Sequence, residues 1–208
     1  FNTHHIIFDG WSMKVFHHDV AALYAAYCQG QPSPLPEPTL QYADFALWQR
    51  GWLADKTMAA QLSYWREQLA GAPQLLSLPT DRPRPPVQTH QGAHYHFRFP
   101  AALAASLRAL CIDTRSTLFM VCLAAWKVLL MRYSGQTDIV VGSPIANRNN
   151  LATEPLIGFF VNNLVLRSDL SGELRFLELL ERIKSTTLDA YRHQDVPFGK
   201  VVEALQPE

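Results

Sequence analysis

A short stretch near the start of the printed sequence gathers side chains that could move protons. His4 and His5 are adjacent, and Asp9 and Gly10 follow after three apolar residues, which gives the pattern HHxxxDG. A neutral imidazole near pH 7 can accept a proton from an attacking amine or alcohol. Gly10 permits a close approach of the backbone, and its N–H can face an oxyanion. The competing interpretation is that both histidines are ordinary strand residues.

The residue types around the histidines argue against a metal site. Residues 3–8 are rich in β-branched and aromatic side chains, and they predict a strand that Asp9 and Gly10 bring to an end. Successive side chains of a strand point to opposite faces, so His4 and His5 could not bind the same ion. An aspartate at a strand end more often fixes a turn or pairs with a cation than takes part in chemistry.

Composition excludes several classes of protein. The chain has 208 residues, 48% of them hydrophobic, and its 18 basic and 18 acidic residues give a formal net charge of zero. With no basic run, nucleic acid and anionic membranes are poor candidates as partners. The three cysteines are odd in number and far apart, which fits a reducing, cytoplasmic setting better than disulfides or a metal: Cys28, Cys111 and Cys122. The longest apolar stretch, residues 118–133, contains Lys127 and predicts a core helix rather than a membrane span.

Hydrophobic periodicity predicts a mixed α and β architecture in which helices cover sheets. Helices are expected over residues 13–29, 41–53, 57–69, 100–111, 117–133, 174–191 and 198–205. Strands are expected over residues 93–99, 138–143 and 158–167, and the proline-rich residues 71–91 are expected to connect two lobes. His94 and His96 share one face of the first of these strands, but with no third ligand nearby they are interpreted as solvated histidines.

Six ordered segments resemble the condensation domains of nonribosomal peptide synthetases, and together they extend over the whole chain. In the first of them the box continues into Trp11 and Ser12. The others are YADFALWQ, LPTDRPRP, DIVVGSPIANR, IGFFVNN and HQDVPF, which start at residues 42, 78, 138, 157 and 193. The chain departs from the family at Asn163, where threonine is usual, and at Gly199, where glutamate is usual. A complete condensation domain is about twice as long, so the resemblance implies that parts are missing at both ends.

The resemblance implies an α/β (α+β) fold of the chloramphenicol-acetyltransferase-like kind. In this fold two similar lobes meet in a V, with the HHxxxDG box at the centre of a tunnel between them. Residues 1–75 would be the C-terminal part of the first lobe, and residues 76–208 the first part of the second lobe.

The same resemblance implies amide-bond formation. The α-amine of an acceptor aminoacyl thioester would attack a donor acyl or peptidyl thioester, each held on the 4'-phosphopantetheine arm of a carrier domain. The implied partners are an upstream donor carrier, a downstream acceptor carrier and an adjacent adenylation domain, with no directly bound cofactor. His5 would lie at the reacting atoms, either as a general base or as a group that orients the amine and stabilises charge.

The resemblance also suggests roles for other residues. Asp9 would be structural and would pair with an arginine from the upstream part of the first lobe; no arginine precedes the box here. His4 would support the strand, and the N–H of Gly10 would face the oxyanion. Weaker candidates for the tunnel or for substrate contacts are Trp11, Ser143, Arg148, Asn162 and Asn163. For Asn162 and Asn163 a structural role, as buried amides that bind a neighbouring loop, is the equal alternative.

Two rival functions remain open. One is a relative with the same box that epimerises a carrier-bound residue or forms an ester. The segments at residues 157–163 and 193–198 resemble condensation domains more closely. The other is a non-catalytic carrier-docking module, and the 208 residues by themselves are expected to be inactive.

Overall fold

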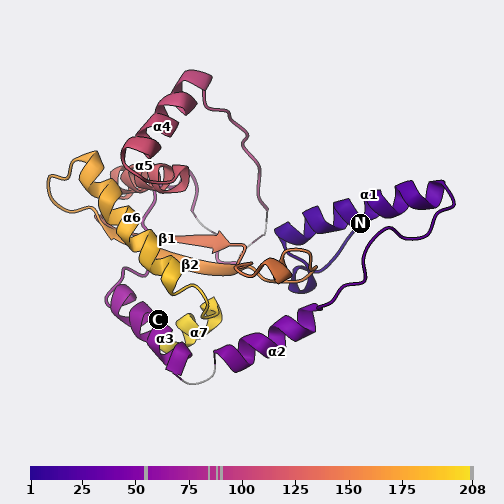
Figure 1. Ribbon diagram of the computed structural model, residues 1–208. Helices are drawn as coiled ribbons and strands as arrows, with labels where there is room; N and C mark the ends of the chain where they lie inside the picture. Colours follow the sequence, from indigo (N-terminus) through magenta and orange to yellow (C-terminus); the bar gives the residue numbers. More distant parts are fainter. Residues whose placement is uncertain (54–55, 84, 88, 90, 207–208) are drawn as a thin grey trace. The chain divides into compact units, whose positions relative to one another are not determined.

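The computed structural model describes residues 1–53, 56–83, 85–87, 89 and 91–206. Helices and two strands follow one another along the chain as labelled in Figure 1. Two short 3₁₀ turns, η1 (His5–Ile7) and η2 (Leu151–Thr153), accompany the strands β1 (Asp138–Ile145) and β2 (Asn162–Asp169). The helices are α1 (Gly10–Cys28), α2 (Tyr42–Trp52), α3 (Lys56–Leu69), α4 (Ala101–Asp113), α5 (Leu118–Ser134), α6 (Phe176–Arg192) and α7 (Phe198–Leu205).

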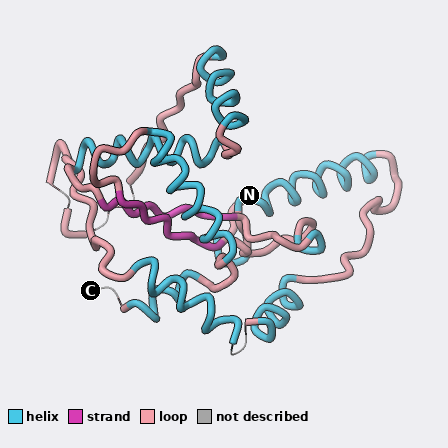
Figure 2. Tube along the Cα trace, turned by 60° about the vertical axis from the view of Figure 1, so that its left-hand side comes forward, coloured by secondary structure: helices cyan, strands magenta, loops and turns pink. Residues whose placement is uncertain are grey.

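The chain forms two compact units. The first comprises Phe1–Gln68, Gly142–Leu164 and Arg192–Pro207, and the second comprises Leu69–Val141 and Val165–Tyr191. Strand β1 pairs with β2 in a two-stranded sheet, drawn in magenta in Figure 2. These units are defined by their internal packing. The division into two lobes at residue 75 stays a prediction.

In the first unit, polar side chains begin the helices that carry the box and its surroundings. Asp9 is the N-cap of α1, and its side chain accepts a hydrogen bond from Ser12 N. Gln41 and Asp44 form a capping box at the start of α2, so two backbone N–H groups that the helix leaves free are satisfied. The buried apolar side chains include Phe8, Leu53, Trp65, Phe160 and Val196.

In the second unit, α5 is the most deeply buried helix. Thr117 caps its start through a bond from Met120 N, and Gly135 ends it in the left-handed conformation that glycine adopts without strain. Buried side chains from α5, α6 and the strands form the core: Met120, Val121, Leu123, Ala124, Leu130, Ile139, Leu166, Leu179, Leu180 and Ile183.

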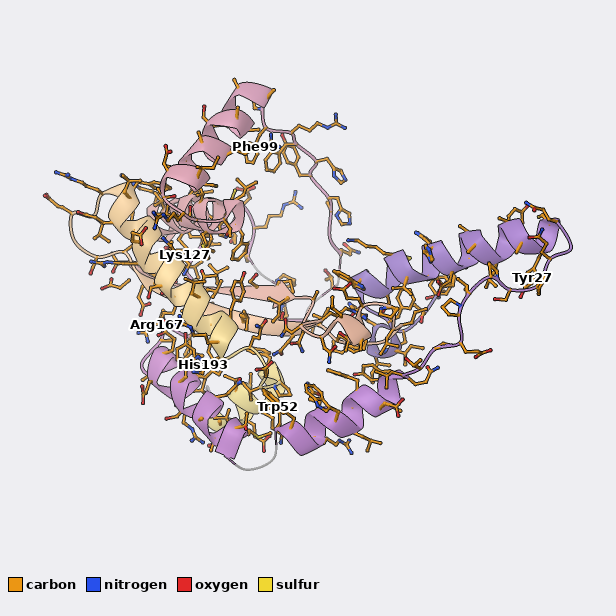
Figure 3. All side chains as sticks on the ribbon, viewed as in Figure 1. Tyr27, Trp52, Phe99, Lys127, Arg167 and His193 are labelled. Carbon is orange, nitrogen blue, oxygen red and sulfur yellow. The ribbon has the colours of Figure 1, made fainter. Side chains whose placement is uncertain are left out.

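A lysine lies inside this core. Lys127 is fully buried, and its Nζ donates to Ile139 O at 3.3 Å, Leu166 O at 2.6 Å and Ser168 Oγ at 2.8 Å. The three acceptors belong to β1 and β2, so the ammonium group of Lys127, which is labelled in Figure 3, joins α5 to both strands. Desolvation lowers the pKa of Lys127 to about 7, against the opposing effect of Asp138.

All seven expected helices are present, but two expected strands are wrong. Residues 3–8 contain the turn η1, because His4 Nδ1 accepts from Ile6 N and the N–H groups of Ile7 and Phe8 bond back to His4 O and His5 O. The backbone groups that a strand would offer to a neighbour are therefore used locally.

The segment expected as a strand at residues 93–99 has no regular structure. The described backbone there has no neighbouring strand, and Tyr95 and Phe97 are 89% and 67% exposed. A period-two pattern forms a strand only when another strand completes its hydrogen bonds. The strands expected at 138–143 and 158–167 are present as β1 and β2, the second displaced toward its C-terminal end.

Among the described helices, none is by itself both long and apolar enough to span a membrane. The consecutive pair α4 and α5, bent by 107°, meets the length and composition criteria jointly.

Candidate functional site

The box is organised around the carboxylate of Asp9, which is 1% exposed. Its Oδ1 accepts from Ser12 N and Ser12 Oγ, both at 2.8 Å, and its Oδ2 accepts from Phe160 N at 3.0 Å. Arg148 Nη2 adds an ion pair at 3.2 Å to Oδ1. The carboxylate is thus saturated with donors and is not available to take a proton from a substrate.

The arginine that pairs with Asp9 corrects the sequence-based expectation of an upstream partner. Arg148 lies 139 residues downstream and is itself buried. Its Nη1 donates to Leu156 O at 2.8 Å and to Thr153 O, and its guanidinium lies 4.0 Å from the centre of the Phe160 ring. The backbone carbonyls fix the guanidinium in the plane that the carboxylate needs.

These contacts shift the pKa values of Asp9 and Arg148. Burial by itself would raise the pKa of Asp9, but the hydrogen bonds from Ser12 and Phe160 and the charge of Arg148 lower that pKa below its ordinary value. Desolvation lowers the pKa of Arg148, and Asp9 opposes that effect. The pair is therefore charged at neutral pH.

The backbone of residues 158–160 forms the surface against which the box packs. Gly158 O accepts from Asp9 N at 3.2 Å and from Ser12 Oγ at 3.0 Å, while Gly158 N donates to Ser12 Oγ at 3.0 Å. Tyr42 Oη donates to Phe159 O at 2.8 Å. A Cβ at Gly158 would overlap Tyr42 Cδ2 and lie 2.9 Å from its Cγ, so this close approach requires glycine.

The two histidines differ in their surroundings. His4 Nδ1 accepts from Ile6 N at 3.1 Å, so this ring is the N-cap of η1. His5 is exposed, and its ring meets the ring of Phe159 edge to face at 5.3 Å between centroids. Of the two, His5 keeps both nitrogens without a hydrogen bond among the contacts of the described residues.

Gly10 and Trp11 open α1 beside the histidines. Gly10 is exposed and occupies the first helical position, where backbone N–H groups have no partner within the helix. Trp11 is fixed by a hydrogen bond from its Nε1 to Glu154 O at 2.9 Å. Lys14 Nζ lies 5.1 Å from the centre of the Trp11 ring.

The remaining candidates do not gather at the box. Asn162 is buried and binds the 194–198 turn: its Nδ2 donates to Gln194 O and Val196 O, both at 2.8 Å, and its Oδ1 accepts from Phe198 N at 2.9 Å. These are the contacts of a structural amide, one of the two interpretations left open. Asn163 is exposed, and Ser143 is partly exposed on β1.

Four residues of the network were not singled out from the sequence: Ser12, Tyr42, Gly158 and Phe160. All four fall within segments that carry the family resemblance, which was the only available signal. Their spacing in the chain does not reveal that they meet, because the contacts join positions more than 100 residues apart.

A metal site finds no support among the residues that the structure describes. No group of three or more His, Cys, Asp or Glu side chains lies close enough to hold an ion. The rings of His94 and His96 stack on each other at 6.1 Å between centroids.

Comparisons with known proteins agree on one family. The condensation domain model matches residues 1–208. A linear gramicidin synthase of Brevibacillus parabrevis is 56% identical over 208 residues, 100% of this chain and 4% of that protein. Phosphinothricin tripeptide synthetase of Streptomyces viridochromogenes is 42% identical over 99% of this chain and 19% of that protein. The chain thus spans only a small part of the relatives that it matches.

Solved structures give the same answer for the fold. The X-domain from teicoplanin biosynthesis matches with a TM-score of 0.90 and 34% identity over 98% of this chain and 46% of that chain. A four-domain nonribosomal peptide synthetase matches with a TM-score of 0.84 and 27% identity over 99% of this chain and 15% of that chain. Fold and sequence together define a domain of the nonribosomal peptide synthetase type. The chain belongs to the condensation domain family.

Proposed function

We propose that this chain carries the catalytic histidine of a domain that forms amide bonds between carrier-bound thioesters. The observation that supports the proposal most is the difference in hydrogen bonding between the aspartate and the second histidine of the box. Asp9 is saturated by Ser12, Phe160 and Arg148, whereas His5 is exposed and free of hydrogen bonds among the described contacts. His5 is therefore the side chain of the box that can meet a substrate.

In this proposal the amine of the acceptor attacks the carbonyl carbon of the donor thioester. The C–N bond forms, the C–S bond breaks and the thiol leaves on the donor's phosphopantetheine arm. The amine must lose a proton as it attacks, and His5 either accepts that proton or orients the amine. The N–H of Gly10, at the open end of α1, is suited to stabilise the oxyanion of the tetrahedral intermediate.

The substrates make carrier domains the implied partners. Each thioester would arrive on the 4'-phosphopantetheine arm of a separate carrier domain, with an adenylation domain in the same parent polypeptide. The relatives support this setting, since their names describe peptide synthetases and one solved neighbour is a four-domain synthetase.

The direct test uses a complete condensation domain that contains this chain, supplied with loaded donor and acceptor carriers. We expect His5→Ala to lower the rate of product formation by about 10²-fold or more, the range that a general acid or base contributes. His94→Ala, which removes another exposed histidine, is the matched control and should retain the native rate. Native turnover in His5→Ala would contradict the role given to His5.

A product analysis separates this proposal from epimerisation. Chiral chromatography of the residues released from the carriers should show a new amide bond and unchanged configuration at the α-carbon. Inversion of the α-carbon without bond formation would support the epimerase alternative and refute condensation. An ester product from a hydroxyl acceptor would support the ester-forming alternative.

A further inference from the structure

One surface of the first unit carries aromatic side chains that the box does not use. Phe45, Trp48 and Trp52 lie on one side of α2, three and four residues apart. The two indoles stack with centroids 5.7 Å apart and planes at 16°, yet Trp48 is 53% exposed and Trp52 is 41% exposed. Large aromatic groups held in order at the surface are typical of binding sites.

Two adjoining cavities follow these rings, and we name them together the Trp48 groove. Each has a volume of about 180 Å³, and they share Phe45, Trp48, Asn150 and Thr153 as walls. Because the two cavities share these walls, together they form one groove that is longer than a single ligand side chain needs. An extended ligand that occupies both cavities fits this form better than a small molecule in one of them.

Amide side chains are frequent in the lining of the first cavity. Asn147, Asn149 and Gln49 line the first cavity, and Asn147 holds a left-handed backbone conformation with φ of +52°. Amide side chains both donate and accept, which matches the alternating C=O and N–H groups of a peptide backbone. The polar lining therefore favours a peptide over a purely apolar ligand.

The charges that line the groove all have the same sign. Asp195 lines the first cavity and Asp44 lines the second, and no lysine, arginine or histidine lines either cavity among the described residues. Gln61 Nε2 donates a hydrogen bond to Asp195 Oδ2 at 3.0 Å. A cationic group is thus favoured, and an anionic group such as a phosphate is opposed.

A guanidinium satisfies both features of the groove. Its plane can stack on an indole by cation–π attraction, and its edge can donate two parallel hydrogen bonds to a carboxylate. We propose that the Trp48 groove binds an extended peptide segment of a partner polypeptide, with an arginine side chain held between the Trp48–Trp52 stack and Asp195. Thr153 and Leu156, which line the groove, also accept hydrogen bonds from Arg148, so the groove adjoins the network that holds Asp9.

The test compares two labelled peptides by fluorescence anisotropy on the complete parent protein. One is Gly-Ala-Arg-Ala-Gly amide, which keeps every backbone N–H, and the other has citrulline in place of arginine, which keeps the shape and removes the charge. We expect saturable binding of the arginine peptide and at least about tenfold weaker binding of the citrulline peptide, as the loss of a charged, stacked group implies. Equal binding of the two peptides, or no saturable binding of either, would overturn the proposal.

Two substitutions assign the binding to this groove. Trp52→Leu removes half of the stack, and Asp195→Asn removes the charge while keeping an oxygen that can accept from Gln61. Each should weaken the arginine peptide by about tenfold. Trp126→Leu, at a tryptophan that is 51% exposed on α5, and Asp113→Asn, at the exposed end of α4, are the matched controls. Circular dichroism checks that each variant is folded, and native affinity in folded Asp195→Asn would refute the site.

Discussion

At the scale of single residues, Asp9 has the role of a structural centre rather than of a catalytic acid or base. Four donor atoms from Ser12, Phe160 and Arg148 make hydrogen bonds to one buried carboxylate. The low pKa of Asp9 stabilises the folded state above the ordinary aspartate pKa, and that stability is lost as the pH falls through the folded value.

Removal of the arginine alone should destabilise the fold strongly. Arg148→Met would leave the Asp9 carboxylate buried without its counter-charge, at a cost of about 3–5 kcal/mol in the free energy of unfolding. Arg108→Met, at an exposed arginine of α4, is the control and should change that free energy little. Urea denaturation of a complete domain measures both.

The double variant makes this prediction specific. Asp9→Asn with Arg148→Met should lose less than the sum of the two single losses, because neither partner is then left as an unpaired charge. Additive losses would show that the ion pair does not couple the two positions.

The close contact with Tyr42 requires glycine at position 158. Gly158→Ala would force a methyl group against the ring of Tyr42 and displace the backbone that binds Ser12, at a cost of about 1–3 kcal/mol. Gly142→Ala is the matched control, since a Cβ there meets no atom within 4 Å. Thermal unfolding should show a lower midpoint for the first variant alone, and equal midpoints would argue against a close approach at Gly158.

At the scale of elements, Lys127 joins one helix to two strands. The folded pKa of about 7 lies below the unfolded value near 10.5, so the unfolded chain binds more protons between these limits. The free energy of unfolding should therefore rise as the pH rises from about 7 toward 10, by at most about 1.4 kcal/mol per pH unit from this group.

Substitution of Lys127 isolates its contribution to the pH dependence of the free energy of unfolding. Lys127→Met should remove that pH-dependent contribution and also destabilise the second unit at every pH, because Ile139 O and Leu166 O lose their donor. Lys200→Met, at a lysine whose side chain is 52% exposed, should leave the slope unchanged. Denaturation at several pH values gives the slope, and an identical slope in Lys127→Met would contradict the prediction.

A second anchor in the same unit uses a guanidinium. Arg167 on β2, labelled in Figure 3, donates to both oxygens of Asp138 on β1, with Nη2 at 2.8 Å from Oδ2. Its Nη1 donates to Ala70 O at 2.7 Å. The hydrogen bond to Asp138 raises the pKa of Arg167 above its ordinary value. The fork of Arg167 thus joins the two strands to residues 70–71 with a geometry that lysine could not reproduce.

At the scale of the whole molecule, the chain matches about 46% of the X-domain chain that resembles it. We expect the 208 residues alone to form no dipeptide from loaded carriers, whereas the complete domain does. Positioning two thioesters supplies a large share of the rate, and that share depends on the whole binding surface. Mass spectrometry of the carriers measures the product. Dipeptide that forms with the isolated chain, and is lost in His5→Ala, would refute the expectation of inactivity.

The sequence by itself determined the helices and the family. Periodicity and capping residues such as Thr117 act within a few positions, so α1 to α7 could be predicted from local pattern. Six ordered motifs identified a condensation domain, and the match to the family confirms that family assignment.

Only the tertiary structure decided how the box is held. The partner of Asp9 is Arg148, its wall is formed by residues 158–160, and the expected strand at residues 3–8 is a turn. The partner and the wall of Asp9 depend on contacts across more than 130 residues, and no local pattern encodes which distant backbone will satisfy a buried carboxylate. The same reason explains why residues 93–99 do not form a strand. Alternation of apolar and polar residues favours an extended conformation, but a strand exists only where a neighbouring strand completes its hydrogen bonds.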